Sequence, residues 1–83
     1  MNLRKHELIG LQVAILRSQD PSLVGVRGLV VDETRNTLVV EAGGREKRVA
    51  KEGTRFRFDV EGGVEVDGAE ILYRPEDRTK KAR

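Results

Sequence analysis

Apolar and polar residues alternate over most of the chain, and turn residues interrupt the alternation at short intervals. The clearest stretch is Thr54–Val60, where Phe56, Phe58 and Val60 fall on one face and charged residues fall on the other. Such alternation is typical of a half-buried strand. On the same grounds we expect strands over Leu11–Arg17, Leu23–Val31, Thr37–Val40, Glu46–Lys51, Thr54–Val60, Val64–Val66 and Ala69–Tyr73. The predicted core comprises Val13, Ile15, Val30, Leu38, Val40, Phe56, Phe58 and Ile71.

Turn residues join these segments into hairpins. Asp32–Asn36 links two β-branched runs, and the pair Gly43–Gly44 supplies the positive φ angles that a two-residue hairpin needs. Glu61–Gly63 is expected to form a further hairpin turn. Gly25 and Gly28 stand within a run that otherwise reads as continuous strand, which predicts a bulge, a sharp bend or a close backbone approach.

Short strands separated by frequent turns indicate a small antiparallel barrel or sandwich. A chain of 83 residues is too short to fill two full sheets, so we predict a single all-β domain over residues 1–83. Its sheet is expected to be strongly bent and antiparallel, with about six strands closed into a barrel over residues 9–74. We expect mobile termini over residues 1–7 and 80–83, and Pro75 favours a short C-terminal helix over Glu76–Lys81.

Composition removes several classes of function. The chain has no cysteine and one histidine, His6, so disulfides, thiolate metal sites and multi-histidine centres are not expected. No apolar run is long enough to cross a bilayer and no signal peptide opens the chain, which predicts a cytoplasmic protein without membrane contact. Asp32 and Glu33 are adjacent in a turn, where a backbone cap is a simpler role than acid–base catalysis. We therefore expect no catalytic residue, metal or cofactor in this chain.

The kind of charge is more informative than its sum. The net charge is only +2, but 36% of the residues are charged and eleven of the sixteen cations are arginine. Arginine presents a planar fork of donors that suits phosphate, which favours a nucleic-acid partner. A surface rich in ion pairs, as in thermophile proteins, would give the same composition. With three aromatic residues, a stacking platform for single-stranded bases is not expected.

Basic residues gather in the fourth and fifth predicted strands and at the C-terminal end. The candidate RNA-binding residues are Arg27, Arg35, Arg45, Lys47, Arg48, Lys51, Arg55, Arg57, Arg74, Arg78 and Lys80. If the fourth and fifth strands pair as a hairpin, then Arg45, Lys47, Arg55 and Arg57 would form one phosphate-contacting face. The alternative is a solvated face whose cations are balanced by Glu46, Glu52 and Asp59.

A surface for a protein partner is a second hypothesis. Its candidate residues are Leu8, Ile9, Leu23, Val24 and Val26, which lie near the N-terminal arm or near a strand edge that Gly25 interrupts. The alternative for the arm residues is that they fold beneath the barrel.

Three segments carry a resemblance to a known family: HELIGL at His6–Leu11, DPSLVGVRGLVVDETRNTLVVE at Asp20–Glu41 and RPEDR at Arg74–Arg78. With these segments the chain resembles archaeal ribonuclease P protein component 1. The resemblance implies an Sm-like barrel that binds ribonuclease P RNA, while that RNA holds Mg²⁺ and removes the 5′ leader of precursor tRNA. It also implies a zinc-ribbon protein subunit as partner, indirect contact with precursor tRNA, and enzymatic activity only within the holoenzyme.

The Sm uridine-binding signature is not found in this sequence, so ring formation and oligo-uridine binding do not follow from the resemblance. We expect a monomer when the chain is isolated. Two rival functions remain open at this point. One is a protein–protein adaptor whose charge serves only solubility, and the other is a ribosome-associated RNA-binding module.

Overall fold

A computed structural model gives the structure of residues 8–72. Its six strands form one antiparallel sheet in the order β4-β3-β2-β1-β5-β6. The strands are β1 (Gln12–Arg17), β2 (Arg27–Glu33), β3 (Thr37–Ala42), β4 (Arg45–Ala50), β5 (Arg55–Phe58) and β6 (Val64–Asp67). The expected mobile termini, the helix over Glu76–Lys81 and the candidates Arg74, Arg78 and Lys80 lie outside the described residues.

Three hairpins follow the turn chemistry of the sequence. Gly43 and Gly44 both have positive φ, 60° and 80°, and join β3 to β4 where Ala42 pairs with Arg45. The loop between β2 and β3 is closed by the backbone N–H of Thr34, which donates to the Thr37 carbonyl at 3.0 Å. Between β5 and β6 the turn places Glu61 at a φ of 49°. All three predicted hairpins are confirmed.

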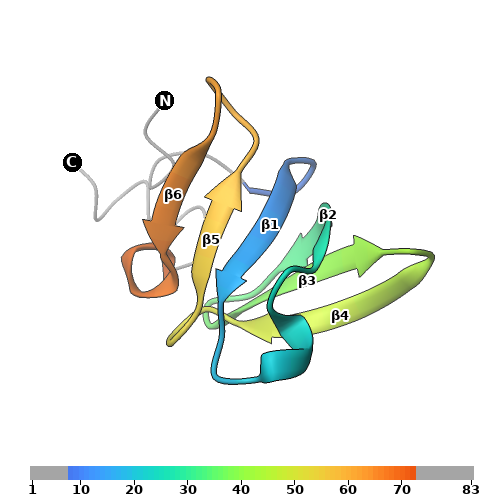
Figure 1. The fold of residues 1–83 in the computed structure, drawn as a ribbon, viewed down its shortest axis with the longest axis horizontal. Helices are drawn as coiled ribbons and strands as arrows, with labels where there is room; N and C mark the ends of the chain where they lie inside the picture. Colours follow the sequence, from blue (N-terminus) through green and yellow to red (C-terminus); the bar gives the residue numbers. More distant parts are fainter. Residues whose placement is uncertain (1–7, 73–83) are drawn as a thin grey trace.

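The sheet is strongly bent. Strands β4 and β5 lie at positions one and five of the sheet, yet only residues 51–54 connect them. A connection that short requires the sheet to curl, and Figure 1 shows β4 running at a steep angle to β1 and β5 and ending near their lower ends. Among the described residues β4 and β6 are not paired with each other, so the hydrogen-bonded ladder stays open. The predicted bend and strand number are confirmed, whereas full closure of the ladder is not.

One glycine marks a close approach between β2 and β3. A Cβ atom on Gly28 in β2 would lie 2.0 Å from the carbonyl oxygen of Glu41 in β3. No side chain fits there, which is the close backbone approach that a glycine inside a strand predicts. Gly25, just before β2, has a φ of 88°.

The concave side of the bend holds the core. All eight predicted core residues are buried there, and Phe56 and Phe58 contact each other with ring centroids 6.0 Å apart. Leu8 and Val49 are buried in the same cluster. Leu8 therefore follows the alternative for the arm residues and packs beneath the sheet.

One predicted strand is wrong, and another begins later than expected. Residues 68–71 form a 3-10 turn, η3 (Gly68–Ile71), where a strand over Ala69–Tyr73 was expected. The turn starts at Gly68, which passes close to the connection between β4 and β5: a Cβ atom there would lie 1.6 Å from the carbonyl oxygen of Lys51, a contact that only glycine allows. The segment before β2 begins with another 3-10 turn, η2 (Pro21–Leu23), so the strand starts at Arg27 instead of Leu23.

Candidate nucleic-acid interface

The two groups of strand cations lie on opposite faces of the sheet. Val49 is buried against the core, so Arg45 and Lys47, at even spacings before it in β4, lie on the core side. In β5 the buried residues are Phe56 and Phe58, which places the neighbouring arginines on the other side. Strand β4 pairs with β3, and β5 pairs with β1 and β6. The predicted single face of Arg45, Lys47, Arg55 and Arg57 is therefore wrong, because the hairpin it required does not form.

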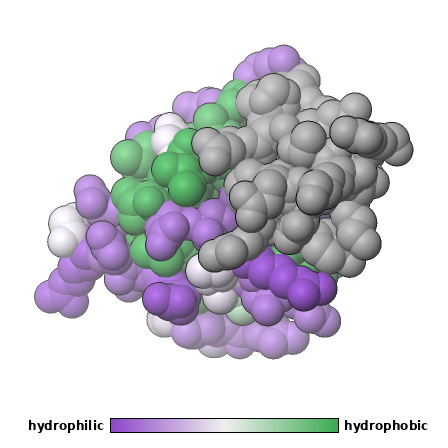
Figure 2. Space-filling view, turned by 180° about the vertical axis from the view of Figure 1, so that it is seen from behind, coloured by the Kyte–Doolittle hydropathy of each residue, from purple (hydrophilic) through white to green (hydrophobic). Residues whose placement is uncertain are grey.

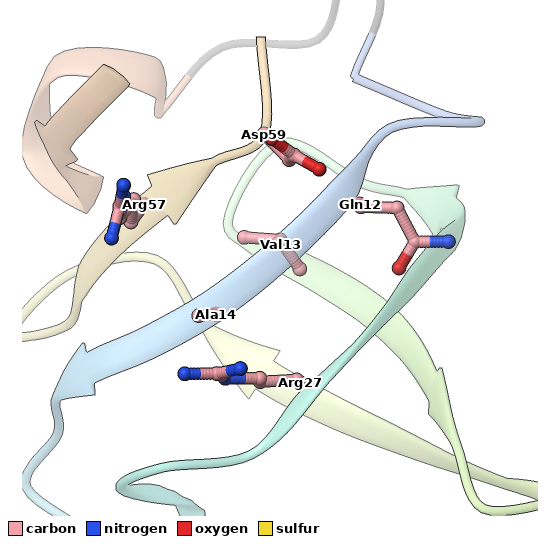
Figure 3. Close-up of a pocket in the computed structure, with 6 residues that line it drawn as sticks. All are labelled: Gln12, Val13, Ala14, Arg27, Arg57 and Asp59. Carbon is pink, nitrogen blue, oxygen red and sulfur yellow. The ribbon is translucent and has the colours of Figure 1, made fainter. Parts of the chain in front are cut away.

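The outer face, defined as the side of the sheet away from the core, has its own arginine arrangement. Ala14 in β1 pairs with Arg27 in β2 on one side and with Arg57 in β5 on the other. Since neighbouring strands lie about 4.8 Å apart, the two arginine backbones are about 10 Å apart with only a methyl group between them. Figure 3 shows both side chains flanking β1 at this point.

A groove of about 410 Å³ runs over this part of the outer face. It is lined by Gln12, Val13, Ala14, Arg27, Arg57 and Asp59. Figure 3 shows Gln12 and Asp59 toward one end of the groove and Arg27 toward the other. The groove thus combines two guanidinium groups with an amide and a carboxylate. We refer to these six residues below as the outer groove.

A β-bulge adds a further arginine to this face. The register between β1 and β5 shifts after Ile15, so that Arg17 pairs with Arg55. Bulges redirect side chains and are common at strand ends. As a result Arg17 lies on the outer face beside the β5 arginines, and Leu16 is 40% exposed. Arg17 was not among the predicted RNA-binding residues, and the alternation of β1 gave no sign of the extra residue.

Two neighbouring arginines of β5 differ in their partners. Arg55 forms ion pairs with both acids of β6, at 3.3 Å from Glu65 and 3.5 Å from Asp67. Arg57 instead donates to the backbone carbonyl of Gly62 at 3.4 Å. Within residues 8–72, Arg57 and Arg27 form no ion pair. The balanced ion-pair surface considered from composition therefore describes Arg55, whereas Arg27 and Arg57 keep their charge available.

A second, smaller hollow of about 210 Å³ lies over β2, β3 and β4 and contains Arg48. Its other lining residues are Asp32, Val39 and Glu46. One cation faces two carboxylates there, so this hollow is a weaker candidate for an anion than the outer groove. Asp32 also accepts a hydrogen bond from the backbone N–H of Glu33 at 2.8 Å, in line with its predicted role as a backbone cap.

The prediction that Lys51 contacts RNA is wrong. Its side chain is fully buried, and Nζ donates to Oε2 of Glu33 at 2.6 Å. Lys51 begins the connection between β4 and β5, and its backbone N–H donates to the carbonyl of Asn36 at 2.8 Å. This lysine therefore stabilises the corner of the sheet. From the sequence, Lys51 could not be distinguished from a surface cation, because its carboxylate partner lies eighteen residues earlier in the chain.

The remaining cations lie at the margins of the sheet. Arg35 is exposed in the β2–β3 loop, Arg45 is exposed at the start of β4, and Lys47 is half-buried. Hydrogen bonds from the hydroxyl and the backbone N–H of Ser22 lower the pKa of Asp20, and the positive charge of Lys47 lowers it further. Lys47 lies on the core side of β4, on the opposite side of the sheet from the outer groove.

We also searched the described residues for a metal-binding cluster, a membrane-spanning helix and a carboxylate pair. Residues 8–72 contain no group of three or more histidine, cysteine, aspartate or glutamate side chains placed to hold a metal ion. No helix among them is long and apolar enough to cross a membrane. Asp32 and Glu33 point to opposite sides of β2, with Glu33 buried and Asp32 exposed, so they do not form a carboxylate pair.

Residues 1–81 match the model of a protein family described as ribonuclease P/MRP, subunit p29. The chain belongs to this family. It is 48% identical over 82 residues to ribonuclease P protein component 1 of Methanocaldococcus jannaschii, covering 96% of this chain and 86% of that protein. The protein of the same name from Methanothermobacter thermautotrophicus is 49% identical over 83 residues, with 96% and 89% covered.

A solved structure of this family has the same fold. It is the structure of Mth11, described as a homologue of human RNase P protein Rpp29, with 49% identity and a TM-score of 0.63 over 88% of this chain and 97% of that one. As a member of the p29 family, the chain is a protein subunit of ribonuclease P and takes part in tRNA processing within that enzyme. The resemblance found in the sequence is confirmed, and the bent sheet fits its Sm-like barrel.

The candidate partner surface divides into buried and exposed residues. Leu8 is fully buried, so the prediction that it contacts a partner is wrong. Leu23 and Val26 are partly buried against the core. Ile9 and Val24 are exposed, at 45% and 49%. In Figure 2, the coloured part of the back of the p29-family domain includes a hydrophobic area bordered by hydrophilic residues. The partner role of these residues stays a prediction.

Proposed function

We propose that this chain binds ribonuclease P RNA and stabilises its folded form, leaving cleavage of precursor tRNA to the RNA and its bound Mg²⁺. The observation that carries the proposal is the outer face, where Arg27 and Arg57 flank Ala14 without an ion-pair partner among residues 8–72. Guanidinium groups that are not already neutralised exchange the counterions of phosphates for protein contacts, which is the main source of affinity for nucleic acid.

The physical role follows from the charge of folded RNA. Helices that pack together bring phosphates close to one another, and their repulsion opposes the fold. Cations fixed on a rigid sheet reduce that repulsion at little entropic cost, because the sheet orders them in advance. A protein of this kind lowers the Mg²⁺ concentration that the RNA needs for folding. Its own residues need perform no bond chemistry.

The partners in the complex form part of the same proposal. We infer that the chain acts beside a zinc-ribbon protein subunit in the cytoplasm and meets precursor tRNA only indirectly. The exposed apolar residues Ile9 and Val24 are the candidate contacts for that subunit. A protein–protein adaptor without RNA contact would leave no role for Arg27 and Arg57, which form no ion pair within residues 8–72.

Reconstitution tests the proposal. Cleavage of precursor tRNA by ribonuclease P RNA would be measured across a Mg²⁺ series, with and without this chain and its zinc-ribbon partner. We expect the protein to shift activity to lower Mg²⁺, and we expect the chain alone to cleave nothing. An unchanged Mg²⁺ dependence together with no RNA binding would overturn the proposal, as would cleavage by the isolated chain.

A further inference from the structure

We propose that the outer groove is the site that receives the RNA backbone, with phosphates at Arg27 and Arg57 and a ribose hydroxyl at Asp59 and Gln12. This inference rests on the proposed function and adds the groove that the RNA enters, the ribose contact at Gln12 and Asp59, and the part of the RNA that each residue contacts. Ribose and phosphate contacts are the usual way in which proteins recognise shaped RNA.

The geometry at Ala14 supports the phosphate contacts. Arg27 and Arg57 occupy the strands on either side of β1 at the same register position. Because the side chain of Ala14 is only a methyl group, there is room for the RNA backbone between the two guanidinium groups. Their backbones, about 10 Å apart, are joined by a hydrogen-bonded sheet, which fixes the spacing before RNA arrives. Each guanidinium presents a planar fork of donors to phosphate oxygens.

The other end of the groove suits a neutral hydroxyl better than a phosphate. The backbone N–H of Asp59 donates to the carbonyl of Gln12 at 2.9 Å, which keeps the two residues adjacent. A carboxylate accepts a hydrogen bond from a hydroxyl and repels a phosphate, and a glutamine amide can donate or accept. The 2′-hydroxyl is both donor and acceptor, and it is the group that distinguishes RNA from DNA.

The neighbouring charges set the limits of the site. Arg55 lies on the same face as Arg57 but is already paired with Glu65 and Asp67. These acids make the β6 side of the outer face unfavourable for phosphates. The groove therefore opens toward β1 and β2, where Arg17 and Arg27 add positive charge.

The first experiment measures the affinity for ribonuclease P RNA as a function of KCl concentration. The test variant is Arg27→Ala with Arg57→Ala, and its matched control is Arg45→Ala with Lys47→Ala, which removes the same charge from the other face. Each lost phosphate contact reduces the salt slope by roughly 0.7–0.9. We expect a slope smaller by about one to two in the groove variant and an unchanged slope in the control.

The outcomes separate this inference from the proposed function. If the folded groove variant shows the wild-type salt dependence of RNA affinity, the inference is overturned while the RNA-binding role stands. The same holds if both double variants reduce the salt dependence equally. Failure of the wild-type chain to bind the RNA would instead overturn the proposed function. Circular dichroism checks that each variant is folded.

The second experiment tests the ribose contact by whether Asp59→Ala raises or lowers the affinity for RNA. Asp59→Ala removes a negative charge next to two arginines. If the carboxylate accepts a hydrogen bond from the ribose, affinity at fixed salt falls several-fold despite the gain in positive charge. If affinity rises, the carboxylate only repels phosphate, and the ribose contact is overturned.

Discussion

The ammonium nitrogen of Lys51 lies 2.6 Å from a carboxylate oxygen of Glu33, and neither side chain reaches solvent. The pair joins the end of β2 to the connection between β4 and β5, which is the point where the sheet must curl. A buried ion pair of this kind adds little net stability over an apolar pair of similar volume. Removing one partner is nevertheless costly, because the charge of the other stays buried without that contact. Its contribution is therefore to specify how the corner folds.

Substitution of one partner should be costly. We expect Lys51→Met to reduce the free energy of unfolding by about 3–5 kcal/mol, because Glu33 stays buried but loses its contact with the Lys51 ammonium group. Urea unfolding followed by circular dichroism measures the change. The double variant Lys51→Met with Glu33→Leu should recover most of the loss. A single variant as stable as the wild type would show that the pair does not hold the corner.

Removal of a core aromatic side chain should have an effect of similar size. Phe58 is fully buried and packs against Phe56. We expect Phe58→Ala to cost about 3–5 kcal/mol through lost burial and a cavity. Leu16→Ala is the control, since Leu16 is exposed on the bulge and its loss should change stability by about 0.5 kcal/mol or less. Equal effects from the two substitutions would contradict the assignment of faces in β1 and β5.

The close approach at Gly28 makes a separate prediction. A methyl group there meets the Glu41 carbonyl, so Gly28→Ala must push β2 away from β3. We expect a loss of about 1–3 kcal/mol, the range for overpacked sites, with faster amide exchange along both strands. The exposed neighbour Arg27→Ala should leave stability and exchange almost unchanged. Unaltered exchange in Gly28→Ala would show that the two strands can separate freely at this point.

Local patterns were sufficient to predict much of the fold. The alternation around Phe56 and Phe58 identified β5 and its buried face, and the pair Gly43–Gly44 identified the β3–β4 turn. The pairing of β5 with β1 could not be inferred in this way. Residues 51–54 resemble an ordinary hairpin turn, and nothing in their local pattern indicates that the chain crosses there to another part of the sheet.

The candidate site was predicted only in part for the same reason. Arg27 and Arg57 were both among the candidates, but they are thirty positions apart in sequence, and their common neighbour Ala14 appears only when the strand order is known. Arg17 was not among the candidates, and its place beside Arg55 depends on a bulge in β1 that the sequence does not reveal. The ion pairs of Arg55 likewise depend on β6 lying beside β5.

Hydroxyl-radical footprinting of ribonuclease P RNA, with the zinc-ribbon subunit present, tests most directly whether this chain binds the RNA through its outer face. We expect the wild-type chain to protect discrete stretches of the RNA backbone, and we expect Arg27→Ala with Arg57→Ala to lose part of that protection. Arg45→Ala with Lys47→Ala should retain all of it. An RNA cleavage pattern that is the same with and without this chain would contradict RNA binding by this subunit.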